Sequence, residues 1–127
     1  MIYLVESDKS FYEASVDLEE VVLRLGFSLL HVFDQGETLR SRGLTCDEDL
    51  KVLAIASPRL TESLLAIDMR LGLALPWRLS VFTEDGATKI GLLRPQPVLA
   101  ALSAQPGVER LAREFEEKLR QIVDEAR

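Results

Sequence analysis

Residue types that crosslink chains or bind metals are scarce in this chain of 127 residues. It contains one cysteine and one histidine, so no disulfide can form within the chain, and a zinc site built from paired Cys and His ligands is excluded. A single cysteine is typical of a reducing compartment, and we therefore expect a cytoplasmic protein. We expect no metal and no cofactor.

Positive charge and long apolar runs are also in short supply. Lysine and arginine total 15 against 21 acidic residues, a net charge of −6 that argues against nucleic-acid binding. The most apolar stretch, residues 60–77, is interrupted by Glu62, Asp68 and Arg70, so no membrane span is expected. The first eight residues carry no basic segment and no long apolar run, so a signal peptide is not expected there.

Asparagine is absent, and arginine is far more frequent than lysine. Loss of thermolabile residues is one feature of heat-adapted proteins, so we expect a thermophilic source. What is present is ordinary for a globular protein: 47% hydrophobic and 28% charged residues. This length and composition predict one domain over residues 1–127 with a substantial core.

The clearest local signal is a β-hairpin around Asp85-Gly86, because glycine accepts the positive φ that a tight two-residue turn needs. With this turn, opposed residues on the two strands share one apolar face, which is predicted to face the core. The predicted pairs are Thr83 with Thr88, Val81 with Ile90, Leu79 with Leu92, and Trp77 with Arg94. The last pair is open to two interpretations: an indole and a guanidinium closing the end of the core, or the wall of a ligand pocket.

Periodicity and capping signals predict the other elements. Ser10 and Glu13 form a capping box before a helix that Gly26 ends, and Ser57-Pro58 starts a second helix. Strands are expected at residues 1–5, 27–33 and 51–56, a short helical turn at 37–42, and helices at 58–67, 98–104 and 108–126. These elements predict an α+β two-layer sandwich: a mixed, largely antiparallel five-stranded sheet with helices, plus a C-terminal amphipathic helix.

Three segments carry a resemblance to a known family. They are Ala56-Ser57-Pro58-Arg59-Leu60, Leu75-Pro76-Trp77-Arg78-Leu79-Ser80-Val81 with residues 86–95 after it, and residues 26–43, where a strand ends at the acidic Asp34. In these segments the chain resembles the domain-of-unknown-function 302 family of bacteria and archaea. The resemblance covers about residues 10–95, so residues 96–127 are interpreted as a C-terminal helical extension packing on the family-like core. The family has no established activity, and Trp77 stands where its members often have cysteine, so thiol chemistry is not expected there.

Candidate site residues cluster near these segments. His31 is either a structural residue among apolar neighbours or a general base, with Asp34 as its carboxylate partner. If Arg59, Arg78 and Arg94 converge near Trp77, they would bind an anion; otherwise they form separate ion pairs. The candidate ligand-binding residues are His31, Asp34, Ser57, Trp77, Arg78 and Arg94. Cys46 lies in an acidic loop without metal-site spacing, and Gly91 is interpreted as a turn or close-packing glycine.

Both faces of the predicted sheet carry apolar residues, and strand alternation places His31 beside Phe27, Leu29 and Phe33. The C-terminal helices cover the second face, or a partner does, most simply a second copy of the chain. We therefore expect a small-ligand-binding or protein-interaction module that forms a homodimer. The alternative is a small enzyme acting on an anionic small molecule, with His31 and Asp34 as acid and base.

Overall fold

The computed structural model describes every residue from Met1 to Arg127 and contains a single sheet. Its strands are β1 (Ile2–Ser7), β2 (Ser28–Asp34), β3 (Leu50–Ala56), β4 (Trp77–Glu84) and β5 (Ala87–Leu93). The strand order is β1-β5-β4-β3-β2, and all four neighbouring pairs are antiparallel. The α+β class is confirmed, and the sheet is antiparallel throughout.

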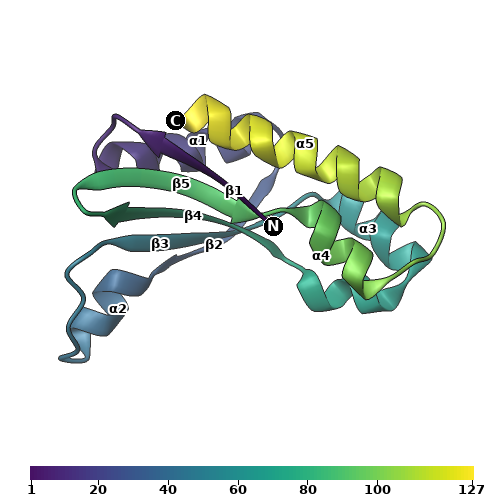
Figure 1. The fold of residues 1–127 in the computed structure, drawn as a ribbon, viewed down its shortest axis with the longest axis horizontal. Helices are drawn as coiled ribbons and strands as arrows, with labels where there is room; N and C mark the ends of the chain where they lie inside the picture. The colour runs from purple at the N-terminus through teal and green to yellow at the C-terminus, as the bar shows by residue number, and fades with distance from the viewer.

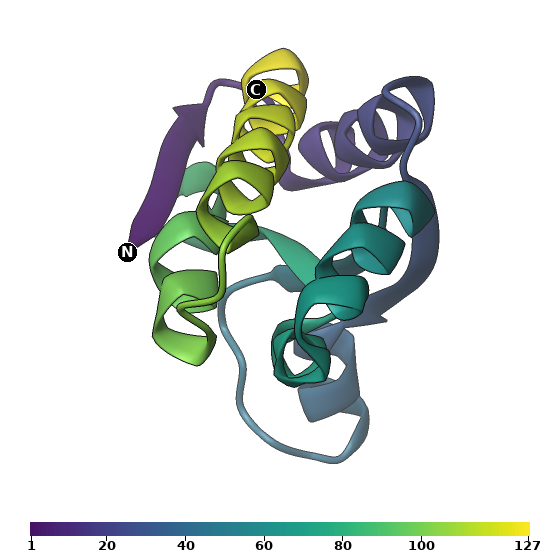
Figure 2. The same ribbon diagram turned by 90° about the vertical axis from the view of Figure 1, so that its right-hand side faces the viewer.

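Helices form the remaining elements of the fold. They are α1 (Phe11–Arg24), α2 (Gln35–Ser41), α3 (Pro58–Ile67), α4 (Pro95–Leu102), α5 (Val108–Ala126) and the 3-10 helix η1 (Met69–Ala74). The long α5 contacts α1, α3 and α4. Figures 1 and 2 show α1 and the C-terminal part of α5 over one side of the sheet, with α3 and α4 beyond the end of the strands. None of the helices is long and apolar enough to cross a lipid bilayer.

The hairpin explains how the core is organised. Asp85 and Gly86 have φ values of 51° and 83°, and the register pairs Val81 with Ile90 and Thr83 with Thr88, as predicted. Side chains of this face are buried against α5, whose Phe115 packs edge-on against Trp77 with ring centroids 5.6 Å apart. The predicted core face of the hairpin is therefore confirmed.

The helix boundaries follow the capping signals. The Ser10 hydroxyl accepts a hydrogen bond from the Glu13 amide at 3.1 Å, and Gly26 has a φ of 87° after the end of α1. Ser57 lies at the N-cap of α3 with Pro58 at the first helical position, but its side chain makes no capping hydrogen bond. Helix α4 begins at Pro95, three residues before the predicted start, because proline fits the first turn of a helix.

The predicted facing of β2 is wrong for part of the strand. Leu29 pairs with Ile55 and His31 pairs with Ala54, so Leu30 is an extra residue in a β-bulge. A bulge shifts the alternation by one residue, and Leu29 therefore shares the core face with Val32 while His31 shares the opposite face with Phe33. Strict alternation had placed Leu29 and His31 together.

Within one chain, the C-terminal helices do not cover the second face of the sheet. The C-terminal helices lie on the same face as α1, and the opposite face has no helix layer over it (Figure 1). Tyr3 and Val5 pack against the helix-covered core. Ile2 and Leu4, which alternate with them, are 60% and 42% exposed.

Candidate binding face

The uncovered side of the sheet is the most unusual surface of the molecule, and we call it the open face. Strand pairing places its residues in three rows across the sheet. They are Glu6, Lys89, Phe82 and Leu50 in the first row, Leu4, Gly91, Ser80, Val52 and Phe33 in the second, and Ile2, Leu93, Arg78, Ala54 and His31 in the third. Most of these side chains are apolar, which is uncommon for a sheet face in contact with water.

A groove of about 240 Å³ lies on this face around Gly91. Leu4, Phe82 and Leu93 supply apolar walls, and Arg78 and Ser80 supply the polar side chains. A Cβ atom added to Gly91 would lie 2.8 Å from the Tyr3 carbonyl oxygen and 2.7 Å from a methyl carbon of Leu4. Only glycine therefore fits here without movement of β1, and the missing side chain keeps the groove open.

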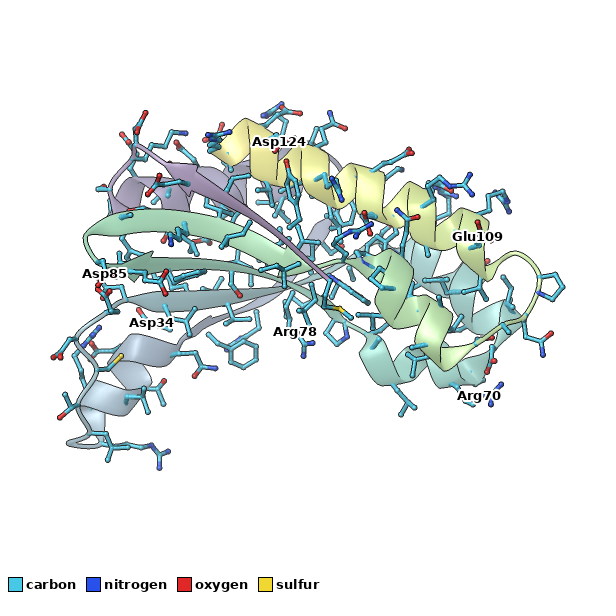
Figure 3. The ribbon with its side chains drawn as sticks, in the orientation of Figure 1. Asp34, Arg70, Arg78, Asp85, Glu109 and Asp124 are labelled. Carbon is cyan, nitrogen blue, oxygen red and sulfur yellow. The ribbon has the colours of Figure 1, made fainter.

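Arg78 is the unpaired basic residue on the central strand of this face. Its guanidinium forms no ion pair and no hydrogen bond, as is true of only two other arginines, Arg42 and Arg110, neither of which lies on the sheet. Figure 3 shows the side chain extending away from α5, on the side of the sheet that no helix covers. By contrast, Lys89 on the same face pairs with Glu84 at 2.6 Å.

His31 is exposed on the open face, where its ring packs edge-on against Phe33 with centroids 4.5 Å apart. It shares a row with Arg78, and the small Ala54 lies between them. Two strand spacings separate their backbones, about 10 Å. His31 and Arg78 thus belong to one surface.

Asp34 does not join His31. Its carboxylate accepts a hydrogen bond from the Glu37 amide at 3.0 Å and so caps α2. Strand pairing places Asp34 opposite Lys51 and His31 opposite Ala54, on opposite faces of the sheet. The acid and base proposed for an enzyme therefore have no common site, and with Ser57 at the start of α3 no Ser–His–Asp triad forms either.

The remaining candidates face the helices. Trp77 is buried, and its indole N–H donates to the Leu93 carbonyl oxygen at 2.8 Å. Arg94 does not stack on that indole; its Nε donates to the Glu116 carboxylate at 3.0 Å. Arg59 pairs with Glu114 of α5. The three arginines do not converge: Arg59 and Arg94 form separate ion pairs with α5, as the second interpretation expected, and Arg78 lies on the other side of the sheet.

Two further features, the single cysteine and a cavity between α4 and α5, are weaker candidates for a functional site. The Cys46 thiol is half-buried in the loop after α2, hydrogen-bonded to the Glu48 carbonyl, and no group of three metal-binding side chains is present in the molecule. A cavity of about 440 Å³ lies between α4 and α5, lined by Gln96, Ser103, Gln105 and Glu109 among others. No buried polar side-chain atom there or elsewhere lacks a hydrogen-bond partner.

The sequence analysis did not identify the groove around Gly91. A glycine inside a strand indicates close approach of another backbone, and that interpretation is correct here. The groove additionally requires that β1 lie beside β5, and sequence patterns do not specify this pairing of the first and last strands.

Comparison with known proteins gives the same fold and no activity. The family described as "Domain of unknown function DUF302" matches residues 3–126. The crystal structure of an uncharacterized conserved DUF302 protein from Bacillus stearothermophilus is similar, with 28% identity and a TM-score of 0.93 over 99% of this chain and 98% of that one. No curated protein matches the chain. The family resemblance is confirmed, but its predicted end near Pro95 is wrong, since the match includes α4 and α5.

Proposed function

The chain belongs to the DUF302 family of unknown function, and we propose that it is a binding module that acts as a homodimer, with the open faces of two copies packed against each other. The observation that carries this proposal is the uncovered apolar sheet face. Ile2, Leu4, Phe33 and Leu93 are all at least 42% exposed on it. Monomeric proteins rarely leave a contiguous apolar patch of this kind in water.

The size of the open face suits a dimer. Five strands at about 4.8 Å spacing and six residues at about 3.3 Å rise give a plane of about 480 Å². Two such planes supply about 1,000 Å², the lower limit for a specific interface. Beyond the two ends of the sheet, α2 and η1 extend on the open side (Figure 1), and Met69 and Leu73 of η1 are 73% and 80% exposed. These residues enlarge the area available to a partner.

A second copy is the partner that matches this surface best. Sheets pack face to face at a spacing of about 10 Å when both present apolar side chains. The same chain offers a surface of equal extent, twist and apolar character, and two-fold symmetry makes such a surface self-complementary. At the hairpin end of the face, Lys89 is already neutralised by Glu84, and the unpaired Glu6 lies on the edge strand β1.

The proposal is tested with a matched pair of leucine variants in analytical ultracentrifugation. Leu93 is 45% exposed on the open face, and Leu23 is 58% exposed on α1. Leu93→Lys buries an unpaired charge in the dimer, which costs about 3 kcal/mol or more and weakens association over a hundredfold. Leu23→Lys leaves dimerisation unchanged. Wild-type protein with the 14.2 kDa mass of one chain at high concentration would refute the proposal, as would a Leu93→Lys dimer as tight as the wild type.

We also propose a cytoplasmic location and a heat-adapted source, on composition alone. The single cysteine suits a reducing compartment, and the absence of asparagine removes one thermolabile residue type.

A further inference from the structure

We propose that the groove around Gly91 binds a small apolar carboxylate, with the Arg78 guanidinium holding the carboxylate group. This inference adds a ligand to the proposed function and rests on the proposed dimer in one respect. In the dimer, the second copy covers a groove that is open to water in a single chain. The site itself consists of residues of one chain, from β1, β4 and β5.

The dimensions of the groove limit the ligand. At about 240 Å³ it is smaller than the roughly 300–1,000 Å³ pockets that take drug-sized molecules. At about 30 Å³ per non-hydrogen atom, the volume that water occupies, it holds about eight such atoms, and a ligand of ten atoms would project from its open side. The walls from Leu4, Phe82 and Leu93 favour an apolar body, such as one aromatic ring or a short hydrocarbon chain.

The charge of the groove defines the head group. Arg78 is the only charged side chain that lines it and has no partner within the chain. A planar guanidinium binds a carboxylate through two parallel hydrogen bonds, and it remains charged at any physiological pH. The Ser80 hydroxyl, adjacent in the second row, can donate a further hydrogen bond to the same carboxylate.

Dimerisation requires a negative charge to pair with the Arg78 guanidinium. Arg78 lies on β4, the central strand, in the third row, so a face-to-face packing that covers this row removes its guanidinium from water. A buried cation without a partner destabilises an interface, whereas a bound carboxylate neutralises it. Glu6, the one unpaired acid of the open face, lies two strands away in the opposite outer row. Ligand binding and dimerisation should therefore reinforce each other.

The test compares phenylacetate with phenylacetamide, which has the same shape but no charge. Isothermal titration of the wild-type protein should give at least tenfold tighter binding of phenylacetate, because a hydrogen bond to a charged group is lost with the amide. Arg78→Gln should abolish this difference. Arg110→Gln, at an unpaired arginine on α5, should preserve it. In NMR spectra of the wild type, phenylacetate should shift the amide signals of Ser80 and Gly91.

Sedimentation of the same samples separates this inference from the dimer proposal. Phenylacetate should tighten the wild-type dimer, and Arg78→Gln should dimerise without ligand at least as well as the wild type. A wild-type dimer that does not distinguish acid from amide refutes the carboxylate site and leaves the dimer standing. If Arg78→Gln weakens the ligand-free dimer, Arg78 pairs with a carboxylate of the other copy, and the inference is overturned. A monomer that binds phenylacetate through Arg78 supports the site and refutes the dimer.

Discussion

Replacing Glu116 by glutamine should destabilise the protein in a manner that depends on pH. Glu116 is 2% exposed on α5. One of its carboxylate oxygens accepts a hydrogen bond from the backbone N–H of Gln96 at 3.1 Å. The other accepts hydrogen bonds from the guanidinium groups of Arg94 at 3.0 Å and Arg120 at 3.2 Å. The carboxylate thus fastens the start of α4 to the middle of α5. Glutamine keeps the shape but presents an NH₂ group to one of these sets of donors.

The magnitude follows from the exposure of the cations. Loss of one partner from a fully buried ion pair costs about 3–5 kcal/mol. Arg94 and Arg120 are 32% and 38% exposed, so both can turn toward water once the carboxylate is gone. We therefore expect a loss of about 2 kcal/mol, which lowers the Tm of a domain of this size by roughly 8 °C. Glu117→Gln, at the exposed neighbouring position, should change stability by less than about 0.5 kcal/mol.

The pH dependence gives a second measurement. Burial raises the pKa of Glu116, but the hydrogen bonds from Gln96 and Arg94 outweigh it and hold the pKa below its ordinary value of 4.5. The unfolded state therefore binds the proton more readily, and the stabilisation is complete above pH 4.5 and is lost as the pH falls through the folded pKa. Urea titrations at pH 7 and at several values below 4.5 should show the difference between wild type and Glu116→Gln narrowing with acid. Equal stability of Glu116→Gln and Glu117→Gln at pH 7 would refute this reasoning.

Two further variants test local packing and capping by chemical denaturation. Gly91→Ala should lower the free energy of unfolding by about 1–3 kcal/mol, because its Cβ would lie 2.8 Å from the Tyr3 carbonyl oxygen and displace β1. Unchanged stability would mean that β1 can move aside without loss of stability. Ser10→Ala should cost about 1 kcal/mol through loss of its capping hydrogen bond. Ser57→Ala should lower the free energy of unfolding by less than about 0.5 kcal/mol, since the Ser57 side chain makes no capping hydrogen bond. Equal losses of stability in the two serine variants would contradict the capping explanation.

Much of the fold was predictable because its signals are local. The turn at Asp85-Gly86, the cap at Ser10 and the apolar stripe of α5 each depend on residues a few positions apart, and each is found as predicted. The facing of β2 was not predictable past Leu29, since the bulge at Leu30 is set by its pairing with β3. One inserted residue there moves His31 onto the open face and separates it from Leu29.

The candidate site was predicted only in part for the same reason. Arg78 and His31 were named from the sequence, and both lie on the open face. Trp77 and Arg94 were named with them, but the indole packs on Phe115 and the guanidinium pairs with Glu116, both on α5. Contacts between β4 and α5, which are far apart in the sequence, cannot be predicted from local periodicity.

The sequence by itself determined the elements, the α+β class and the hairpin register, because short-range backbone preferences and apolar periodicity control these features. The family was indicated separately, by the resemblance of three segments to known motifs. Tertiary structure decided which face of the sheet the helices cover and which side chains remain without partners. The two long helices pack on one side, where α1 contacts β4 and β5 and α5 contacts α1 and β1. The open face, with Arg78 on its central strand and Gly91 beneath a groove, is what that packing leaves exposed. The groove depends in addition on the pairing of β1 with β5, a long-range contact that no local pattern encodes.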